Sequence, residues 1–174
     1  PPADAEHAQR ALHILHEGRR PVALFPGNFK KKENRWPEAG FAALADRLAE
    51  DRALAPYWLA GPGELERVEA AAELAAARLP VLGPFTLGRT AGVLQRSALY
   101  IGNCTGTSHL AVCVGTPTFT VLAGYTAEVW APEGSPPHWR AVGADWESCR
   151  GVSVNEAWTA LQPALYFCRS ANLA

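Results

Sequence analysis

Short apolar runs alternate with segments of helical periodicity along almost the whole chain. The runs have the length of strands buried on both faces, and the segments between them repeat apolar residues every three or four positions. Strand–helix–strand units at this spacing build an open parallel sheet through right-handed crossovers. The sequence therefore predicts an α/β fold, a Rossmann-like open parallel sheet with helices on both faces.

The alternation predicts five strands and six helices. The strands are expected at residues 21–25, 57–60, 81–82, 98–101 and 117–122. The helices are expected at residues 5–17, 37–48, 64–78, 87–96, 106–114 and 153–165. Residues 124–150 contain several Pro and Trp residues and are predicted to be irregular.

Length and charge narrow the class of protein. The 174 residues suit a single domain over residues 1–174, and the formal net charge of −1 provides no field for binding nucleic acid. No apolar run approaches the roughly 20 residues that span a bilayer, and no signal peptide opens the chain. Because the chain begins with Pro1 and not Met, we expect it to be part of a longer protein.

The four cysteines are expected to be free thiols in a reducing cytoplasm. Cys104, Cys113, Cys149 and Cys168 form no C-x-x-C pair and have no His at zinc-ligand spacing. A chain of this size and apolar fraction does not need a disulfide framework. No metal site is expected.

Three loops are the candidate binding regions. Ligands of an open parallel sheet bind outside the carboxyl ends of the strands, where loops lead into helices. Residues 26–36, 61–64 and 102–109 are predicted to lie there. No G-x-G-x-x-G and no P-loop motif occurs, which disfavours nicotinamide enzymes and P-loop NTPases.

The loop at 102–109 has the composition of an anion site. Gly106 permits close backbone approach, and Thr105 is a residue that starts helices. A helix beginning there would direct backbone N–H groups and its positive dipole end at a phosphate, with His109 as a further donor. An ordinary capped helix, with His109 bonded to neighbouring backbone, explains the same residues.

The other two loops allow two interpretations each. Lys31 and Lys32 belong to a run of three lysines that either clamps a diphosphate or forms a solvated face. Glu64 either accepts hydrogen bonds from two ribose hydroxyls or is a favourable acid in the first turn of a helix.

Several blocks of sequence together resemble a known family. In order, they are Arg35-Trp36-Pro37, Ala60-Gly61-Pro62-Gly63-Glu64, residues 102–111, Gly115-Thr116-Pro117, and Tyr125-Thr126 with Trp130. They look like the C-terminal domain of the bacterial ADP-heptose:lipopolysaccharide heptosyltransferases, glycosyltransferase family nine. The resemblance covers about residues 20–162.

The resemblance implies one half of a GT-B glycosyltransferase. This half would bind the nucleotide-sugar donor, and an N-terminal half absent from this chain would hold the acceptor and the general base. The implied reaction is inverting transfer of heptose from an ADP-linked donor in lipopolysaccharide or other bacterial glycan assembly, without metal or cofactor. The enzyme would be cytoplasmic, in peripheral contact with the inner membrane, and this fragment alone would be inactive. The donor-binding residues carried over are Asn28, Lys31, Lys32, Asn34, Glu64, Phe85, Cys104, Thr105, Gly106 and His109.

Two residues depart from the family pattern. Asn34 stands where the family has Lys, a loss that Lys31 or Lys32 could cover, and Cys104 stands where it has Asp. A thiol is a poor hydrogen-bonding substitute for a carboxylate. The departures therefore indicate either a different donor sugar or a non-catalytic relative that binds a nucleotide sugar or a partner. A third alternative is an unrelated phosphate-binding enzyme, such as an epimerase with a similar two-domain cleft.

Overall fold

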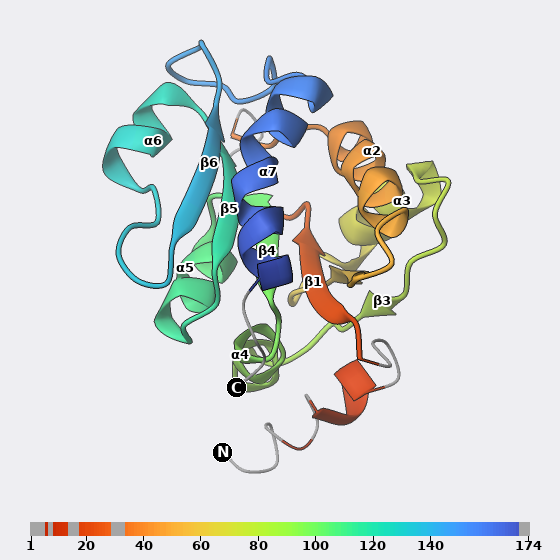
Figure 1. Ribbon diagram of the computed structural model, residues 1–174. Coiled ribbons are helices and arrows are strands. Elements are labelled where there is room, and N and C mark those ends of the chain that lie inside the picture. Colours follow the sequence, from red (N-terminus) through yellow and green to blue (C-terminus); the bar gives the residue numbers. More distant parts are fainter. Residues whose placement is uncertain (1–5, 7–8, 14–17, 29–33, 171–174) are drawn as a thin grey trace.

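A computed structural model describes residues 6, 9–13, 18–28 and 34–170, and it confirms the Rossmann-like fold (Figure 1). Six strands form one parallel sheet in the order β3-β2-β1-β4-β5-β6. Their bounds are β1 Arg20–Phe25, β2 Leu54–Leu59, β3 Val81–Leu82, β4 Leu99–Asn103, β5 Thr118–Leu122 and β6 His138–Val142.

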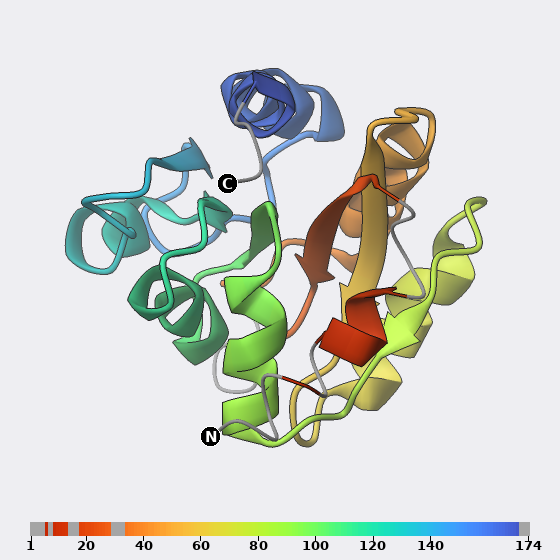
Figure 2. The ribbon, with the colours of Figure 1, turned by 60° about the horizontal axis from the view of Figure 1, so that its bottom comes forward.

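The helices cover both faces of the sheet, as Figure 2 shows for α7 and α4. Their bounds are α2 Glu38–Ala49, α3 Leu65–Leu74, α4 Leu87–Gln95, α5 Gly106–Cys113, α6 Gly124–Val129 and α7 Val154–Ser170. Buried residues of α2, α3 and α7 form one apolar cluster, and those of α4 and α5 belong to another. The two clusters lie on opposite faces of the sheet.

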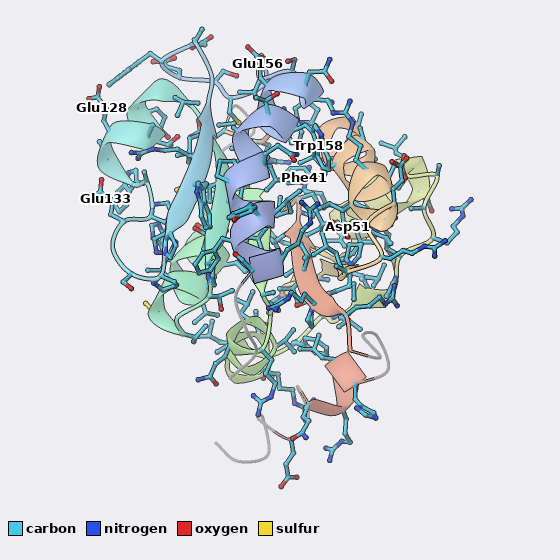
Figure 3. All side chains as sticks on the ribbon, in the orientation of Figure 1. Phe41, Asp51, Glu128, Glu133, Glu156 and Trp158 are labelled. Atoms are coloured by element: carbon cyan, nitrogen blue, oxygen red, sulfur yellow. The ribbon has the colours of Figure 1, made fainter. Side chains whose placement is uncertain are left out.

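Successive side chains of a strand point to opposite faces of the sheet, so β1, β2 and β4 each contribute residues to both apolar clusters. In β1, Val22 and Leu24 join the α2–α3–α7 cluster, whereas Ala23 and Phe25 join the α4–α5 cluster. Both faces are therefore buried, which explains why the central strands are continuous apolar runs. Figure 3 shows Phe41 of α2 and Trp158 of α7 in the space between these two helices.

The segment 124–150 corrects one prediction. It was expected to be irregular, yet it contains α6 and the parallel edge strand β6, which pairs with β5. Of the five residues of β6 only Ala141 is buried, so the strand lacks the apolar run that marks the central strands. An edge strand with this exposure has no periodicity that distinguishes it from a loop.

Two helices end well away from their predicted last residues, whereas the ends of α2, α4 and α5 differ from the predictions by one residue. Helix α3 ends at Leu74 and not near residue 78, because Ala75 is extended and the Ala77 N–H donates to Asp46 Oδ1 at 2.8 Å. Helix α7 continues past residue 165 to Ser170, where buried Cys168 extends its apolar stripe. Of the helix predicted at 5–17, the described residues are helical and the others lie outside the described part.

Candidate functional site

A pocket opens where β1 and β4 lie side by side. Helix α2 follows β1 onto one face of the sheet, and α5 follows β4 onto the other. The loops leaving the two strands therefore diverge and create the crevice in which open α/β sheets bind ligands. The pocket has a volume of about 730 Å³, and all three predicted loops contribute residues to it.

Most of the predicted donor-binding residues line this pocket. Seven of the ten do so: Asn28, Asn34, Glu64, Cys104, Thr105, Gly106 and His109. Phe85 does not line it, and packs instead against the α4–α5 cluster around Phe25 and Tyr100. Lys31 and Lys32 lie outside the described residues. The assignment of the seven residues to donor binding stays a prediction.

The N-terminus of α5 faces the pocket. Thr105 caps the helix by accepting from the Thr107 N–H at 3.2 Å, and the Ser108 hydroxyl completes a capping box. The helix is thus an ordinary capped helix whose start also lines the pocket. A Cβ added at Gly106 would meet no atom within 4 Å, so the backbone there is open to a ligand.

Glu64 carries the only carboxylate among the described residues that line the pocket. It precedes α3, and its carboxylate lies so close to Gly27 that a Cβ there would overlap it. Burial raises the pKa of Glu64, while the nearby charges of Arg67 and Arg35 act in the opposite direction. The carboxylate can accept hydrogen bonds from hydroxyl groups that enter this end of the pocket.

Hydrogen bonds between uncharged groups connect the residues of another wall of the pocket. Asn28 Nδ2 donates to the Asn34 carbonyl at 3.2 Å, and Asn34 Nδ2 donates to the Tyr125 hydroxyl. Asn34 Oδ1 is buried and has no protein partner. The position where the family resemblance expects a lysine therefore presents an amide, fixed by a tyrosine from the start of α6. Tyr125 was seen in the sequence only as part of a family-like segment.

Asn103 joins the two loops that flank the crevice. Its side chain is fully buried. Nδ2 donates to the carbonyls of Pro26 at 3.0 Å and Gly27 at 3.3 Å. Oδ1 accepts from the Trp36 N–H at 2.9 Å. The loops after β1 and β4 are thereby held together. Sequence reasoning missed this role because the bonded partners lie far away in the chain.

Cys104, His109 and Trp130 meet at the β5 side of the pocket. The Cys104 thiol donates to the Trp130 carbonyl at 3.4 Å and lies 3.9 Å from His109 Nε2. The rings of His109 and Trp130 pack edge to face with centroids 6.4 Å apart. Burial raises the pKa of Cys104, so the neutral thiol is favoured there.

Neither a metal cluster nor a membrane span is found in the part of the chain that the structure describes. Across residues 6, 9–13, 18–28 and 34–170, no three His, Cys, Asp or Glu side chains gather in a way that could hold a metal ion. Within the same ranges, no helix has the length and apolarity needed to cross a membrane. The four cysteines are free.

Comparison with protein families gives a match over most of the chain. The model of glycosyltransferase family 9 (heptosyltransferase) matches residues 2–145. No curated protein sequence matches the chain.

Solved structures of similar fold include members of the same family. A family 9 glycosyl transferase from Veillonella parvula DSM 2008 has a TM-score of 0.79 at 19% identity, covering 94% of this chain and 51% of the other. E. coli ADP-heptose lps heptosyltransferase II has a TM-score of 0.72 at 16% identity, covering 94% and 51%. E. coli heptosyltransferase WaaC with ADP has a TM-score of 0.71 at 24% identity, covering 90% and 48%. The chain thus spans about half the length of these proteins.

Proposed function

The chain belongs to glycosyltransferase family 9, the heptosyltransferase family, and from this premise we propose that it is the donor-binding half of an inverting nucleotide-sugar glycosyltransferase. The donor is an ADP-linked heptose or a similar sugar, and the product belongs to lipopolysaccharide or another bacterial glycan. Family membership sets aside the alternative of an unrelated phosphate-binding enzyme. The proposed enzyme is cytoplasmic and in peripheral contact with the inner membrane.

The observation that carries the proposal is the pocket between β1 and β4. Glu64 lies at its β2 side and the start of α5 lies at its centre, so a ribose and a diphosphate can be bound in the order in which a nucleotide sugar presents them. Backbone N–H groups and the helix dipole at Gly106 would take up charge on the leaving diphosphate. WaaC, a relative of this fold, was solved with ADP.

We assign the general base to a second domain. Inverting transfer needs a carboxylate or a similar group within hydrogen-bond reach of the acceptor hydroxyl. Glu64 is the only carboxylate among the described residues that line the pocket, and the proposal places it at the ribose. The chain spans about half the length of its structural relatives, which supports an acceptor domain elsewhere in the full protein. This chain alone is therefore expected to bind donor weakly and to transfer no sugar.

Thermal unfolding with ADP tests the proposal. Selective binding to the folded state should raise the melting temperature, and Gly106→Val should abolish the rise by placing methyl groups where the phosphates approach. Because a Cβ at Gly106 meets nothing within 4 Å, the variant is expected to fold. Gly151→Val is the matched control, since its Cβ also enters open space and Gly151 does not line the pocket. A melting temperature that no nucleoside diphosphate changes at millimolar concentration would contradict the proposal.

A non-catalytic relative is the second candidate, and Cys104 favours it. The thiol stands where the family resemblance expects an aspartate, and it bonds to a protein carbonyl. The two candidates differ in the full-length protein: an enzyme transfers the sugar from donor to acceptor, whereas a binding protein only retains the donor. Assay of the full-length protein with ADP-heptose and a heptose-accepting glycan distinguishes them.

A further inference from the structure

We propose that Trp130 is a specificity-determining residue, and that its indole is the platform on which the ring of the donor sugar stacks. This inference rests on the proposed function, because it requires a nucleotide sugar in the pocket. It concerns a residue that sequence reasoning did not place in the donor site.

The order of the strands determines which end of a bound donor would lie at which side of the pocket. Glu64 follows β2, the start of α5 follows β4, and Trp130 ends α6, which follows β5. Because the strands lie in the order β2-β1-β4-β5, these three groups line the pocket from one side to the other. A donor with its ribose at Glu64 and its diphosphate at α5 therefore brings its sugar to the side where Trp130 lies.

The backbone of Trp130 is fixed while its ring stays accessible. Its N–H donates to the Thr126 carbonyl at 2.9 Å, and its carbonyl accepts from the Cys104 thiol at 3.4 Å. The residue is nevertheless 56% exposed and lines the pocket. A large, half-exposed indole in the lining of the pocket leaves apolar surface that a ligand can cover.

The chemistry around Trp130 fits a sugar ring. A pyranose presents C–H groups on its faces and hydroxyls at its rim, so an aromatic ring can cover a face while donors and acceptors bind the rim. His109 packs against Trp130 and supplies a polar ring nitrogen beside it. Cys104 contributes a neutral sulfur where a carboxylate is expected from the family resemblance. Sugar recognition at this position thus relies on stacking in place of a charged hydrogen bond.

Calorimetry with ADP and with ADP-heptose separates the sugar contact from the nucleotide contact. For the wild-type chain we expect tighter binding of ADP-heptose than of ADP. Trp130→Ala should weaken ADP-heptose about three- to tenfold, the range expected for one aromatic stacking contact, and should leave ADP affinity unchanged. Trp130→Phe keeps an aromatic face and should retain most of the difference. Tyr166→Ala is the control, because Tyr166 is also an exposed aromatic, on α7, and it does not line the pocket.

The possible results distinguish the platform from the proposed function. Equal wild-type affinity for ADP and ADP-heptose overturns the platform and leaves nucleotide binding intact. Equal weakening of both ligands by Trp130→Ala also overturns it, since Trp130 would then support the nucleotide. Failure of the wild-type chain to bind either ligand overturns the proposed function, and the platform with it. Circular dichroism and the melting temperature of each variant establish that it is folded.

Discussion

Removing the side chain of Asn103 is expected to destabilise the whole domain and to weaken nucleotide binding. Asn103→Ala deletes three buried hydrogen bonds, two to the carbonyls of Pro26 and Gly27 and one from the Trp36 N–H. Each contributes roughly 0.5–1.5 kcal/mol net, and their partners stay buried, so the expected loss in the free energy of unfolding is about 2–4 kcal/mol. For a domain of this size, that corresponds to a fall in melting temperature of roughly 5–15 °C.

Urea unfolding of the wild type and three variants measures this loss. Asn103→Asp keeps the shape but points a carboxylate oxygen at two carbonyls, so it should cost at least as much as Asn103→Ala. Asn155→Ala is the matched control: its exposed side chain accepts one hydrogen bond, from Arg47 at 2.8 Å, and its removal should cost less than about 0.5 kcal/mol. Calorimetry with ADP should show weaker binding by Asn103→Ala under conditions where the variant is folded. A loss of stability as small as that of Asn155→Ala would refute the role assigned to Asn103.

Three further expectations follow from the charges and thiols. Burial raises the pKa of Glu64, so as the pH falls this carboxylate should be protonated at a higher pH than an ordinary glutamate, and ADP binding should weaken. In titration calorimetry, the ADP affinity of Glu64→Gln should depend less on pH than that of the wild type. Iodoacetamide at pH 8 should modify exposed Cys113 well before buried Cys168, because burial raises the pKa of Cys168 to about 11. Equal rates of modification in mass spectrometry would contradict the burial of Cys168. The Arg169–Asp51 ion pair, 2.5 Å between nitrogen and oxygen and partly exposed, should contribute less than about 1 kcal/mol. Arg169→Gln should therefore lower urea stability only slightly, and less so at high salt.

Strong periodicity made the central fold predictable. The runs that became β1 and β4 are apolar on both faces, and a parallel sheet with helices on each side is the arrangement that buries them. The edge strand β6 was not predictable, because only Ala141 of its residues is buried and its neighbours resemble those of a loop. The early end of α3 depends on Asp46, a residue of another helix, and local propensity contains no information about that contact.

The site was predictable where a loop follows a strand, and less so elsewhere. Thr105 and Gly106 could be placed because glycines and capping residues after a strand mark the binding edge of such a sheet. Phe85 could not, because the direction of its side chain depends on which apolar cluster it joins. Asn103 and Trp130 act through contacts between segments far apart in sequence, for which a single sequence holds no periodic signal.

The pairing of β1 with β4 also bears on how the domain folds. In the described sheet, all neighbouring strands except β1 and β4 are consecutive in the chain. Strands β1–β3 and strands β4–β6 can therefore each assemble from segments that are close in sequence. The seam between them closes a much longer loop, and contacts of high sequence separation form slowly. Because the pocket straddles this seam, we expect a nucleotide to bind only after the two halves of the sheet have joined. The appearance of nucleotide binding during refolding would therefore report when β1 pairs with β4. Circular dichroism would detect the helices of either half before that pairing.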